Sequence, residues 1–343
     1  MAQLRNYRIL MARTPVGLPV PEDFASDEVN VVAPAAGQFL SRTLFLSLDP
    51  YYRSVMKNSP IYAERLAPGD VMIGETVAEV IESCLAGFQC GDIVAVRNGW
   101  QLYALSNGND VRKLDQRAAP ISTALGVLGM PGLTGYAGTV FLGQPKAGEI
   151  FVVSAATGPV GSTAGQTARL LGARVVGIAG SDTKCAYAVQ ALGFADCINY
   201  RKVDLAAALK RACPNGIDVY FDNVGGDVLA AVFQNLARHA RIVLCGMIAS
   251  YSLDKPLPGP NLGPVVGARA TVKGLVVYDY LERMPEMIET LSGWMQEGRF
   301  HYREDIVDGL AAAPVAFCRL MRGENFGKAL VRVAVAQGQT AVA

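Results

Sequence analysis

A strand, a glycine-containing turn and a helix follow one another after residue 149, and this run sets the strongest limit on the fold. Ile150–Val153 is apolar and suits a buried strand, and small residues then lead through Gly158 and Gly161 into a segment that predicts a helix. Gly158 would let the backbone approach a pyrophosphate, and Gly161 would let the helix pack closely on the strand. The free N–H groups of the first helical turn would face the phosphates. Ala156 stands where the usual pattern has its first glycine, so an accidental glycine turn remains an alternative.

Strands alternate with helices from this point on, which predicts a parallel sheet covered on both faces. The expected strands are Ile150–Val153, Arg174–Ile178, Cys197–Asn199, Asp218–Phe221, Arg241–Leu244 and Thr271–Val277. The expected helices are Gly161–Leu171, Lys184–Leu192, Leu205–Ala212, Val228–Ala237 and Met284–Glu297. This arrangement is typical of a doubly wound α/β sheet of the Rossmann type.

Residues 1–120 follow a different pattern, in which short strands alternate with Pro and Gly turns. Such strands at Thr43–Leu48, Gly74–Ile81 and Gly91–Val96 predict a small barrel or curled sheet. Met130–Tyr136 is rich in turn formers and is interpreted as a linker, and a last strand at Lys328–Val335 would return to the first domain. We therefore expect one domain from residues 1–125 and 300–343, and a second from residues 126–299.

The composition excludes several classes of function. A chain of 343 residues, 51% of them hydrophobic, is long enough for two cores, and 31 Lys and Arg against 30 Asp and Glu give no bias toward nucleic acid or an anionic membrane. The seven cysteines are scattered without a Cys-x-x-Cys pair and there are only two histidines, so we expect free thiols in a reducing cytoplasm and no metal. The N-terminus lacks the apolar core of a signal peptide, and no apolar run is long enough to span a membrane.

The second strand of the Rossmann pattern favours NADP over NAD. An NAD site has an acidic residue about 20 positions past the glycine turn, where this chain has Ala179. Ser181 can donate a hydrogen bond to a 2′-phosphate, and Lys184 supplies a positive charge. Asp182 is an alternative ribose-binding acid, although we expect it to cap the helix that starts near Thr183. Lys184 could also be an ordinary solvated lysine at a helix start.

Several segments together resemble one known family. They include Leu46–Arg53, Gly129–Thr134, Ala155–Ser162, Phe221–Gly226, Cys245–Tyr251, His301–Glu304 and Gly323–Lys328. In this order they resemble the zinc-independent medium-chain dehydrogenase/reductases, in the branch of NADPH-dependent alkenal/one (double-bond) reductases that includes the bacterial curcumin reductases and the prostaglandin reductases. The resemblance implies a GroES-like β-barrel domain with a C-terminal return, an inserted Rossmann domain and a homodimer. It also implies reduction of the C=C bond of α,β-unsaturated carbonyls.

The resemblance assigns roles to individual residues. Tyr251 matches a tyrosine beside the nicotinamide ribose and the substrate carbonyl. Tyr51 matches a substrate-pocket tyrosine, and Tyr52 and Tyr62 are further substrate-binding candidates. The implied NADPH-binding residues are Pro159, Val160, Gly161, Ser162, Lys184, Tyr200, Asn223, Cys245, Gly246, Met247, Ile248, Tyr251, Leu275, Val276, Val277 and Asn325.

The expected chemistry needs no metal. Hydride addition to the β-carbon of an enone places negative charge on the carbonyl oxygen, and a phenol with an ordinary pKa of about 10 can donate a hydrogen bond there at neutral pH. Tyr251 is therefore the candidate catalytic residue, although it could be a core tyrosine with a backbone partner. The residues near the expected substrate wall depart from the family pattern, since Tyr52 replaces a common Met and Glu75 a common Gly or Gln. The proline-rich loop Ser252–Pro264 is either a substrate loop or a plain surface loop.

Other functions remain alternatives. A quinone reductase of the same superfamily would share the fold and the cofactor. A non-catalytic NADPH-binding redox sensor would keep the cofactor site without the reaction. A zinc alcohol dehydrogenase is disfavoured because no cluster of metal ligands is present in the sequence.

Overall fold

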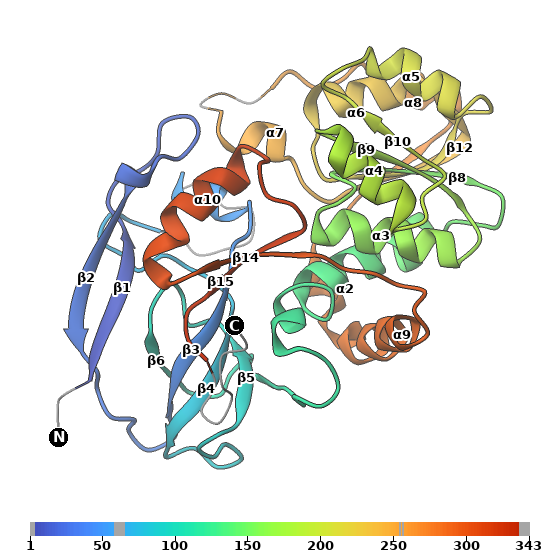
Figure 1. Ribbon diagram of the computed structural model, residues 1–343. Coiled ribbons are helices and arrows are strands. Elements are labelled where there is room, and N and C mark those ends of the chain that lie inside the picture. Colours follow the sequence, from blue (N-terminus) through green and yellow to red (C-terminus); the bar gives the residue numbers. More distant parts are fainter. Residues whose placement is uncertain (1–3, 58–65, 254, 256, 336–343) are drawn as a thin grey trace. The chain divides into compact units, whose positions relative to one another are not determined.

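The computed structural model describes residues 4–57, 66–253, 255 and 257–335 (Figure 1). The chain divides into two compact units, one formed by Met1–Leu125 with Glu304–Ala343 and the other by Gly126–Arg303. Within the described residues, no helix has both the length and the apolar character that crossing a bilayer requires.

The first unit is built on a seven-stranded sheet in the order β14-β15-β3-β4-β5-β7, with β6 paired to β3. Its strands are β3 (Phe39–Ser47), β4 (Thr76–Ser83), β5 (Ile93–Val96), β6 (Tyr103–Ser106), β7 (Arg112–Lys113), β14 (Glu304–Asp308) and β15 (Lys328–Arg332). The predicted strands near residues 43, 74 and 91 are thereby confirmed. The C-terminal strand β15 does return to this unit, because it pairs antiparallel with β3.

Among the described residues, this unit also holds a two-stranded ladder, two α-helices and the short 3-10 helices η1 (Pro21–Asp23), η2 (Ile121–Leu125) and η5 (Leu310–Ala312). The ladder joins β1 (Arg5–Met11) to β2 (Phe24–Asn30), and the helices are α1 (Tyr52–Met56) and α10 (Ala313–Met321). Helix α1 follows β3 directly after the turn at Asp49-Pro50, so it starts at the end of a buried strand.

The second unit is a six-stranded parallel sheet in the order β10-β9-β8-β11-β12-β13. Its strands are β8 (Ile150–Ser154), β9 (Arg174–Ala179), β10 (Asp196–Asn199), β11 (Ile217–Asp222), β12 (Leu236–Leu244) and β13 (Thr271–Gly274). Strand order reverses between β8 and β11, which is where a doubly wound sheet binds its ligand. The alternating pattern of the sequence is confirmed.

Helices cover both faces of this sheet. Phe151 and Val153 of β8 face a core that includes Ala164 and Ala168 of α3, whereas Val152 faces a second core that includes Leu209 of α5. The strands are therefore apolar on both sides, and this explains why their sequences show little alternation. The helices of the unit are α2 (Met130–Ala137), α3 (Pro159–Leu170), α4 (Asp182–Gln190), α5 (Leu205–Ala212), α6 (Gly226–Phe233), α7 (Ile248–Tyr251), α8 (Gly263–Ala268) and α9 (Met284–Gln296).

Three segments differ from the sequence predictions. The linker predicted at Met130–Tyr136 is helix α2, and a Cβ at Gly135 would lie 2.6 Å from the carbonyl oxygen of Val160. Gly135 therefore allows α2 to pack closely against α3 and does not form a turn. Helix α6 ends at Phe233, because the chain from Leu236 already pairs with β11. Strand β13 ends at Gly274, three residues before the predicted end.

Candidate active site

The glycine turn between β8 and α3 has the geometry of a backbone cradle. A Cβ at Gly161 would lie 2.4 Å from the carbonyl oxygen of Ala155, so only glycine fits there. Ala155 itself has a left-handed φ of 50°, and Gly158 is the N-cap of α3. Pro159 occupies the first position of the helix, where its missing N–H costs nothing. The first-turn N–H groups beyond it have no partner within the helix, which makes this end of α3 suited to an anion.

Ala156 is accommodated in this turn by a glycine on the neighbouring strand. It is fully buried, and its methyl group lies 2.9 Å from the place where a Cβ on Gly177 of β9 would stand. The missing side chain at Gly177 therefore leaves room for Ala156. Ser162, one turn into α3, is also buried and donates its hydroxyl to the carbonyl oxygen of Pro159 at 3.4 Å.

The end of β9 carries the predicted phosphate-binding residues. Ser181 is the N-cap of α4, since its Oγ accepts a hydrogen bond from the Lys184 N–H at 3.3 Å. The predicted cap, Asp182, is instead the first helical residue, because the extended backbone ends one position earlier than expected. Lys184 is half-buried in the first turn of this helix.

Tyr200 lies beside the same strand end, and the structure adds a cation next to it. The Tyr200 N–H donates to the carbonyl oxygen of Ala179 at 3.2 Å. The Arg201 guanidinium carbon lies 5.8 Å from the centroid of the Tyr200 ring, and its Nε is 3.4 Å from the Tyr200 hydroxyl. The Arg201 side chain is also close to Gly180, because a Cβ added to Gly180 would lie 3.4 Å from Arg201 Nε. Sequence reasoning missed Arg201, and its position directly after Tyr200 was the available signal.

A buried carboxylate organises the ends of β11 and β12. Asp222 is fully buried, and its Oδ1 accepts hydrogen bonds from the hydroxyls of Ser154 and Tyr220 at 3.1 and 2.7 Å. Its carboxylate also accepts the N–H groups of Val224 and Gly225. Burial, followed by the charge of Asp222, raises the pKa of Tyr220 well above that of an ordinary phenol. The turn after β11 is therefore held in one conformation.

Asn223 and the turn after β12 are fixed by this arrangement. The Asn223 side-chain amide donates to the carbonyl oxygen of Ser154 at 2.8 Å. The N–H groups of Cys245 and Gly246 both donate to the carbonyl oxygen of Asp222, at 2.9 and 3.1 Å. A Cβ at Gly246 would lie 3.0 Å from the carbonyl oxygen of Asn223, so the two turns approach closely. The structure thus brings the predicted residues of both turns together beside β8.

Tyr251 ends the short helix α7 that follows this turn. Its hydroxyl accepts a hydrogen bond from the Met247 N–H at 3.2 Å and keeps its own proton to donate. The backbone partner that the core alternative predicted does exist, but the side chain is half-buried and not part of a core. Burial is the main cause that raises the pKa of Tyr251 above the ordinary phenol value, so the hydroxyl stays protonated at neutral pH.

The remaining cofactor candidates differ in their exposure and in the unit to which they belong. Leu275 is buried and its side chain belongs to the core around β8, so only its backbone is available to a ligand. Ile248, Val276 and Val277 are half-buried, and Met247 is exposed. Asn325 belongs to the first unit, where its amide donates to the carbonyl oxygen of Gly327 at 2.8 Å and closes the turn before β15.

The predicted substrate tyrosines differ in their exposure. Tyr51 is half-buried, whereas Tyr52 is only 1% exposed and packs edge-on against it with ring centroids 4.6 Å apart. Tyr52 is therefore not placed to contact a substrate, and the alternative of aromatic packing describes it better. Tyr62 lies outside the described residues. The loop Ser252–Pro264 is partly described, and its end forms the start of α8 at Gly263.

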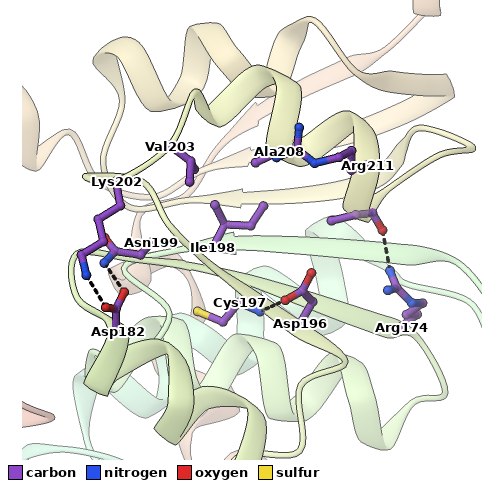
Figure 2. Close-up of a pocket in the computed structure, with 11 residues that line it drawn as sticks. Arg174, Asp182, Asp196, Cys197, Ile198, Asn199, Lys202, Val203, Ala208 and Arg211 are labelled. Atoms are coloured by element: carbon purple, nitrogen blue, oxygen red, sulfur yellow. Dashed lines mark hydrogen bonds and ion pairs between the residues drawn. The ribbon is translucent and has the colours of Figure 1, made fainter.

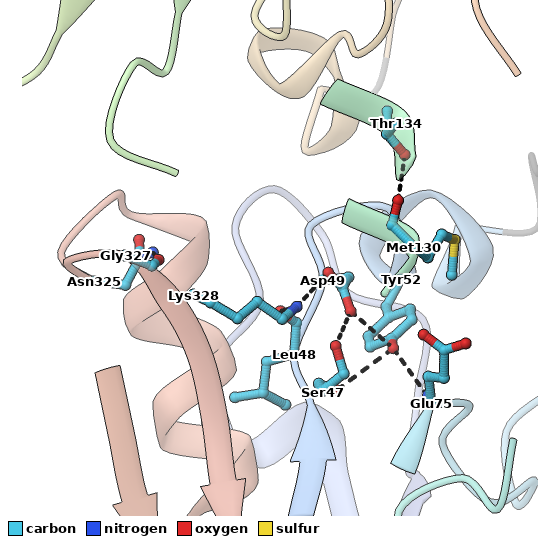
Figure 3. Close-up of polar contacts among 10 residues, drawn as sticks. All are labelled: Ser47, Leu48, Asp49, Tyr52, Glu75, Met130, Thr134, Asn325, Gly327 and Lys328. Atoms are coloured by element: carbon cyan, nitrogen blue, oxygen red, sulfur yellow. Dashed lines mark hydrogen bonds and ion pairs between the residues drawn. The ribbon is translucent and has the colours of Figure 1, made fainter. Parts of the chain in front are cut away.

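Charged side chains surround Tyr52 at the end of β3 (Figure 3). The buried Lys328 lies 2.5 Å from Asp49, and Asp49 accepts a hydrogen bond from the Tyr52 hydroxyl at 3.2 Å. The Glu75 side chain stands next to this group. Burial, followed by the charge of Asp49, raises the pKa of Glu75, although Arg97, Lys328 and Arg112 act in the opposite direction.

Comparisons with known proteins match this two-unit arrangement. The N-terminal domain of oxidoreductase family matches residues 7–114, and the family described as zinc-binding dehydrogenase matches residues 159–293. The NADPH-dependent curcumin reductase of Escherichia coli is 46% identical over 96% of this chain and 97% of its own length. The chain belongs to the medium-chain dehydrogenase/reductases. The NADP(+)-dependent 2-alkenal reductase of Nicotiana tabacum is 38% identical over 96% of this chain and 98% of its own length.

Solved structures of this family confirm the predicted fold class. CurA from Vibrio vulnificus has a TM-score of 0.92 and 42% identity, and the match covers 97% of this chain and 100% of that one. CurA has also been solved in complex with NADPH. The Escherichia coli quinone oxidoreductase has a TM-score of 0.79 at 22% identity, over 95% of this chain and 99% of that one, and therefore shows the fold alone. The α/β architecture with a GroES-like unit and a Rossmann unit is that of the medium-chain family.

The name of the matching zinc-binding family raises the question of a metal. Across the part of the chain that the structure describes, no three His, Cys, Asp or Glu side chains come together as a metal site requires. Cys245, the cysteine nearest the proposed reaction centre, has its pKa raised to about 12 by burial and by Asp222, so it is a neutral thiol.

Proposed function

We propose that this protein is an NADPH-dependent reductase of the C=C bond of α,β-unsaturated carbonyls, with enals, enones and curcumin-like diarylheptanoids as the substrate class. The single observation that carries the reaction is the Tyr251 hydroxyl, which is protonated and has its lone pair engaged by Met247. The relatives' names, which are curcumin, prostaglandin and alkenal reductases, support the same chemistry.

The residues of the second unit fit NADPH. The N-terminal turn of α3, from Pro159 to Ser162, would bind the pyrophosphate, because Gly161 keeps the backbone open and close to β8. Lys184 and Tyr200 would bind the 2′-phosphate. The nicotinamide half would lie along Asn223 and the two segments Cys245–Ile248 and Leu275–Val277. Asn325, a residue of the first unit, is proposed for the cofactor on the family resemblance alone. Bound there, NADPH supplies the hydride.

Tyr251 would act on the carbonyl end of the substrate. Its O–H donates a hydrogen bond to the oxygen on which negative charge develops, and this lowers the barrier to enolate formation. The N–H of Met247 polarises the same hydroxyl and so strengthens it as a donor. Tyr251 can also pass a proton toward the α-carbon, directly or through water, which completes the reduction. No step requires a metal, and we propose that the enzyme is zinc-independent.

The two units would have different roles, one in binding the substrate and the other in binding NADPH. Unit one would be the substrate domain, with Tyr51 against the substrate and Tyr52 packed edge-on against Tyr51. Unit two would be the NADP-binding domain. All seven cysteines carry free thiols, which supports a reducing, cytoplasmic location.

We also propose a homodimer. Strand β13 lies at the edge of the parallel sheet, and all four of its residues are exposed. An uncovered strand edge is a ready site for pairing with a second copy. Light scattering would test this assembly, and a monomer at all concentrations would contradict it.

The deciding experiment is an assay of NADPH oxidation across enals, aryl and cyclic enones, diarylheptanoids and quinones, with and without a chelator. We expect enones to be reduced with the highest kcat/KM, with no loss after chelation. A preference for quinones would favour the quinone reductase alternative. NADPH binding without oxidation by any compound would instead identify a redox sensor.

A further inference from the structure

An ion pair between Asp182 and Lys202 lies at the start of α4 (Figure 2), the helix that carries Ser181 and Lys184 of the proposed 2′-phosphate site. The Asp182 carboxylate accepts hydrogen bonds from Lys202 Nζ at 2.5 Å and from Asn199 Nδ2 at 2.6 Å. Asn199 ends β10 and Lys202 lies in the turn after it, so both partners reach Asp182 from the neighbouring strand. Asp182 itself follows Ser181, the N-cap that stands next to Lys184 in the proposed phosphate site.

The charge of Asp182 matters more here than the stability of the pair. The hydrogen bonds from Lys202 and Asn199 are the main causes that lower the pKa of Asp182, so the carboxylate is ionised at physiological pH. The side chains of Asp182 and Lys202 are 65% and 66% exposed, and exposed pairs contribute little to folding. A bare carboxylate at this place would repel a 2′-phosphate, which is dianionic, and would instead suit the 2′-hydroxyl of NADH.

Two cations belong to the proposed phosphate site, and Asp182 is the acidic residue in the first turn of α4. Lys184 lies in the first turn of α4 and Arg201 follows the end of β10, and the Arg201 guanidinium lies over the Tyr200 ring and near Gly180. Lys202 is the residue that compensates the one acid in the first turn of α4.

We propose that Lys202 is a specificity-determining residue for the cofactor, which acts through Asp182 and not through the phosphate. Lys202 holds and neutralises the Asp182 carboxylate, so the positive charges of Lys184 and Arg201 act on a 2′-phosphate without opposition from an unpaired Asp182. The proposal rests on the proposed NADPH function and specifies what gives its 2′-phosphate preference.

The test is a double-mutant cycle of Lys202→Gln and Asp182→Asn, with Lys210→Gln as a matched control that removes an exposed lysine from α5. Dissociation constants for NADPH and NADH are measured by cofactor fluorescence, and the melting temperature is measured for each variant. We expect Lys202→Gln to weaken NADPH about three- to tenfold at low salt, because one unscreened carboxylate then faces the phosphate within a Debye length. NADH binding should stay within about twofold, since it lacks the 2′-phosphate.

The Asp182→Asn background separates the proposal from its rivals. With Asp182 neutral, the loss caused by Lys202→Gln should be clearly smaller than in the wild-type background, because no carboxylate is then left uncompensated. A loss of the same size in both backgrounds would show that Lys202 acts on the phosphate without Asp182, and this would overturn the proposal. Equal losses of NADPH and NADH would indicate a structural role and would overturn it as well.

Failure of the proposed function would look different. A wild-type protein that binds NADH as well as NADPH would refute the cofactor assignment and this proposal together. A wild-type protein that prefers NADPH, with an unchanged preference in Lys202→Gln, would refute only the role of Lys202.

Discussion

The two glycines of the β8–α3 turn should respond differently to the same added methyl group. In Gly161→Ala the new Cβ would lie 2.4 Å from the Ala155 carbonyl oxygen, 2.9 Å from its carbonyl carbon and 3.1 Å from the Ser154 carbonyl oxygen. All three atoms belong to the backbone, so no side chain can rotate away. In Gly158→Ala the nearest such atom is the Ala155 oxygen at 3.3 Å, and the φ of −71° suits any residue.

These distances give the expected magnitudes. Overpacking of this kind costs about 1–3 kcal/mol, because backbone must shift to relieve it. For a unit of the size of Gly126–Arg303, this corresponds to a melting temperature about 2–12 °C lower for Gly161→Ala. Gly158→Ala should change the melting temperature less than Gly161→Ala does, because its 3.3 Å contact needs only a small shift and alanine reduces the entropy of the unfolded chain by about 0.4–1 kcal/mol.

For NADPH affinity we expect the larger effect in the other variant, Gly158→Ala. A methyl group at Gly158 would stand between the backbone and the pyrophosphate. The loss of one charge-assisted contact, about 1.5–3 kcal/mol, would weaken NADPH roughly tenfold or more.

The assay is calorimetry of the protein without cofactor, followed by a fluorescence titration with NADPH. Equal melting temperatures for the two variants would refute the packing argument for Gly161. Wild-type affinity in Gly158→Ala would refute the close approach of this backbone to the pyrophosphate.

Three further predictions concern single side chains. Tyr251→Phe should lower kcat by about 10²–10³ with little change in NADPH binding, as expected when one donor to an oxyanion is removed; an unchanged kcat would move the donor elsewhere, with Tyr51 next in line. Lys184→Ala should weaken NADPH by about tenfold or more and NADH little, and titrations with equal losses would contradict a 2′-phosphate contact. Because the pKa of Glu75 is raised in the folded protein, its contribution to stability is present at low pH and is lost as pH rises through that pKa. Glu75→Gln, which cannot ionise, should therefore melt at a higher temperature than wild type at about pH 8 and at the same temperature at about pH 4, and equal melting points at both values would contradict this.

Local pattern predicted most elements of the second unit. The apolar run at Ile150–Val153 and the spacing of Gly158 and Gly161 depend on neighbouring residues only, and the structure confirms a strand, a tight turn and a helix there. The same reasoning failed at α2, where Gly132 and Gly135 suggested a turn. Their backbone packs against other segments, and a sequence does not show which segment a glycine will meet.

In the candidate site, too, some features follow from the local sequence and others from tertiary contacts. The sequence by itself determined that a glycine cradle would precede a helix, that no acid would stand at Ala179, and that a tyrosine would follow the turn at Cys245. Only the tertiary structure decided that Ser181 and not Asp182 caps α4, that Asp182 pairs with Lys202, and that Tyr52 is buried and packs against Tyr51. The first set follows from the conformational preferences of adjacent residues. The second depends on contacts between strands and helices far apart in the chain, because burial and the pairing of charges are fixed only when those elements pack together.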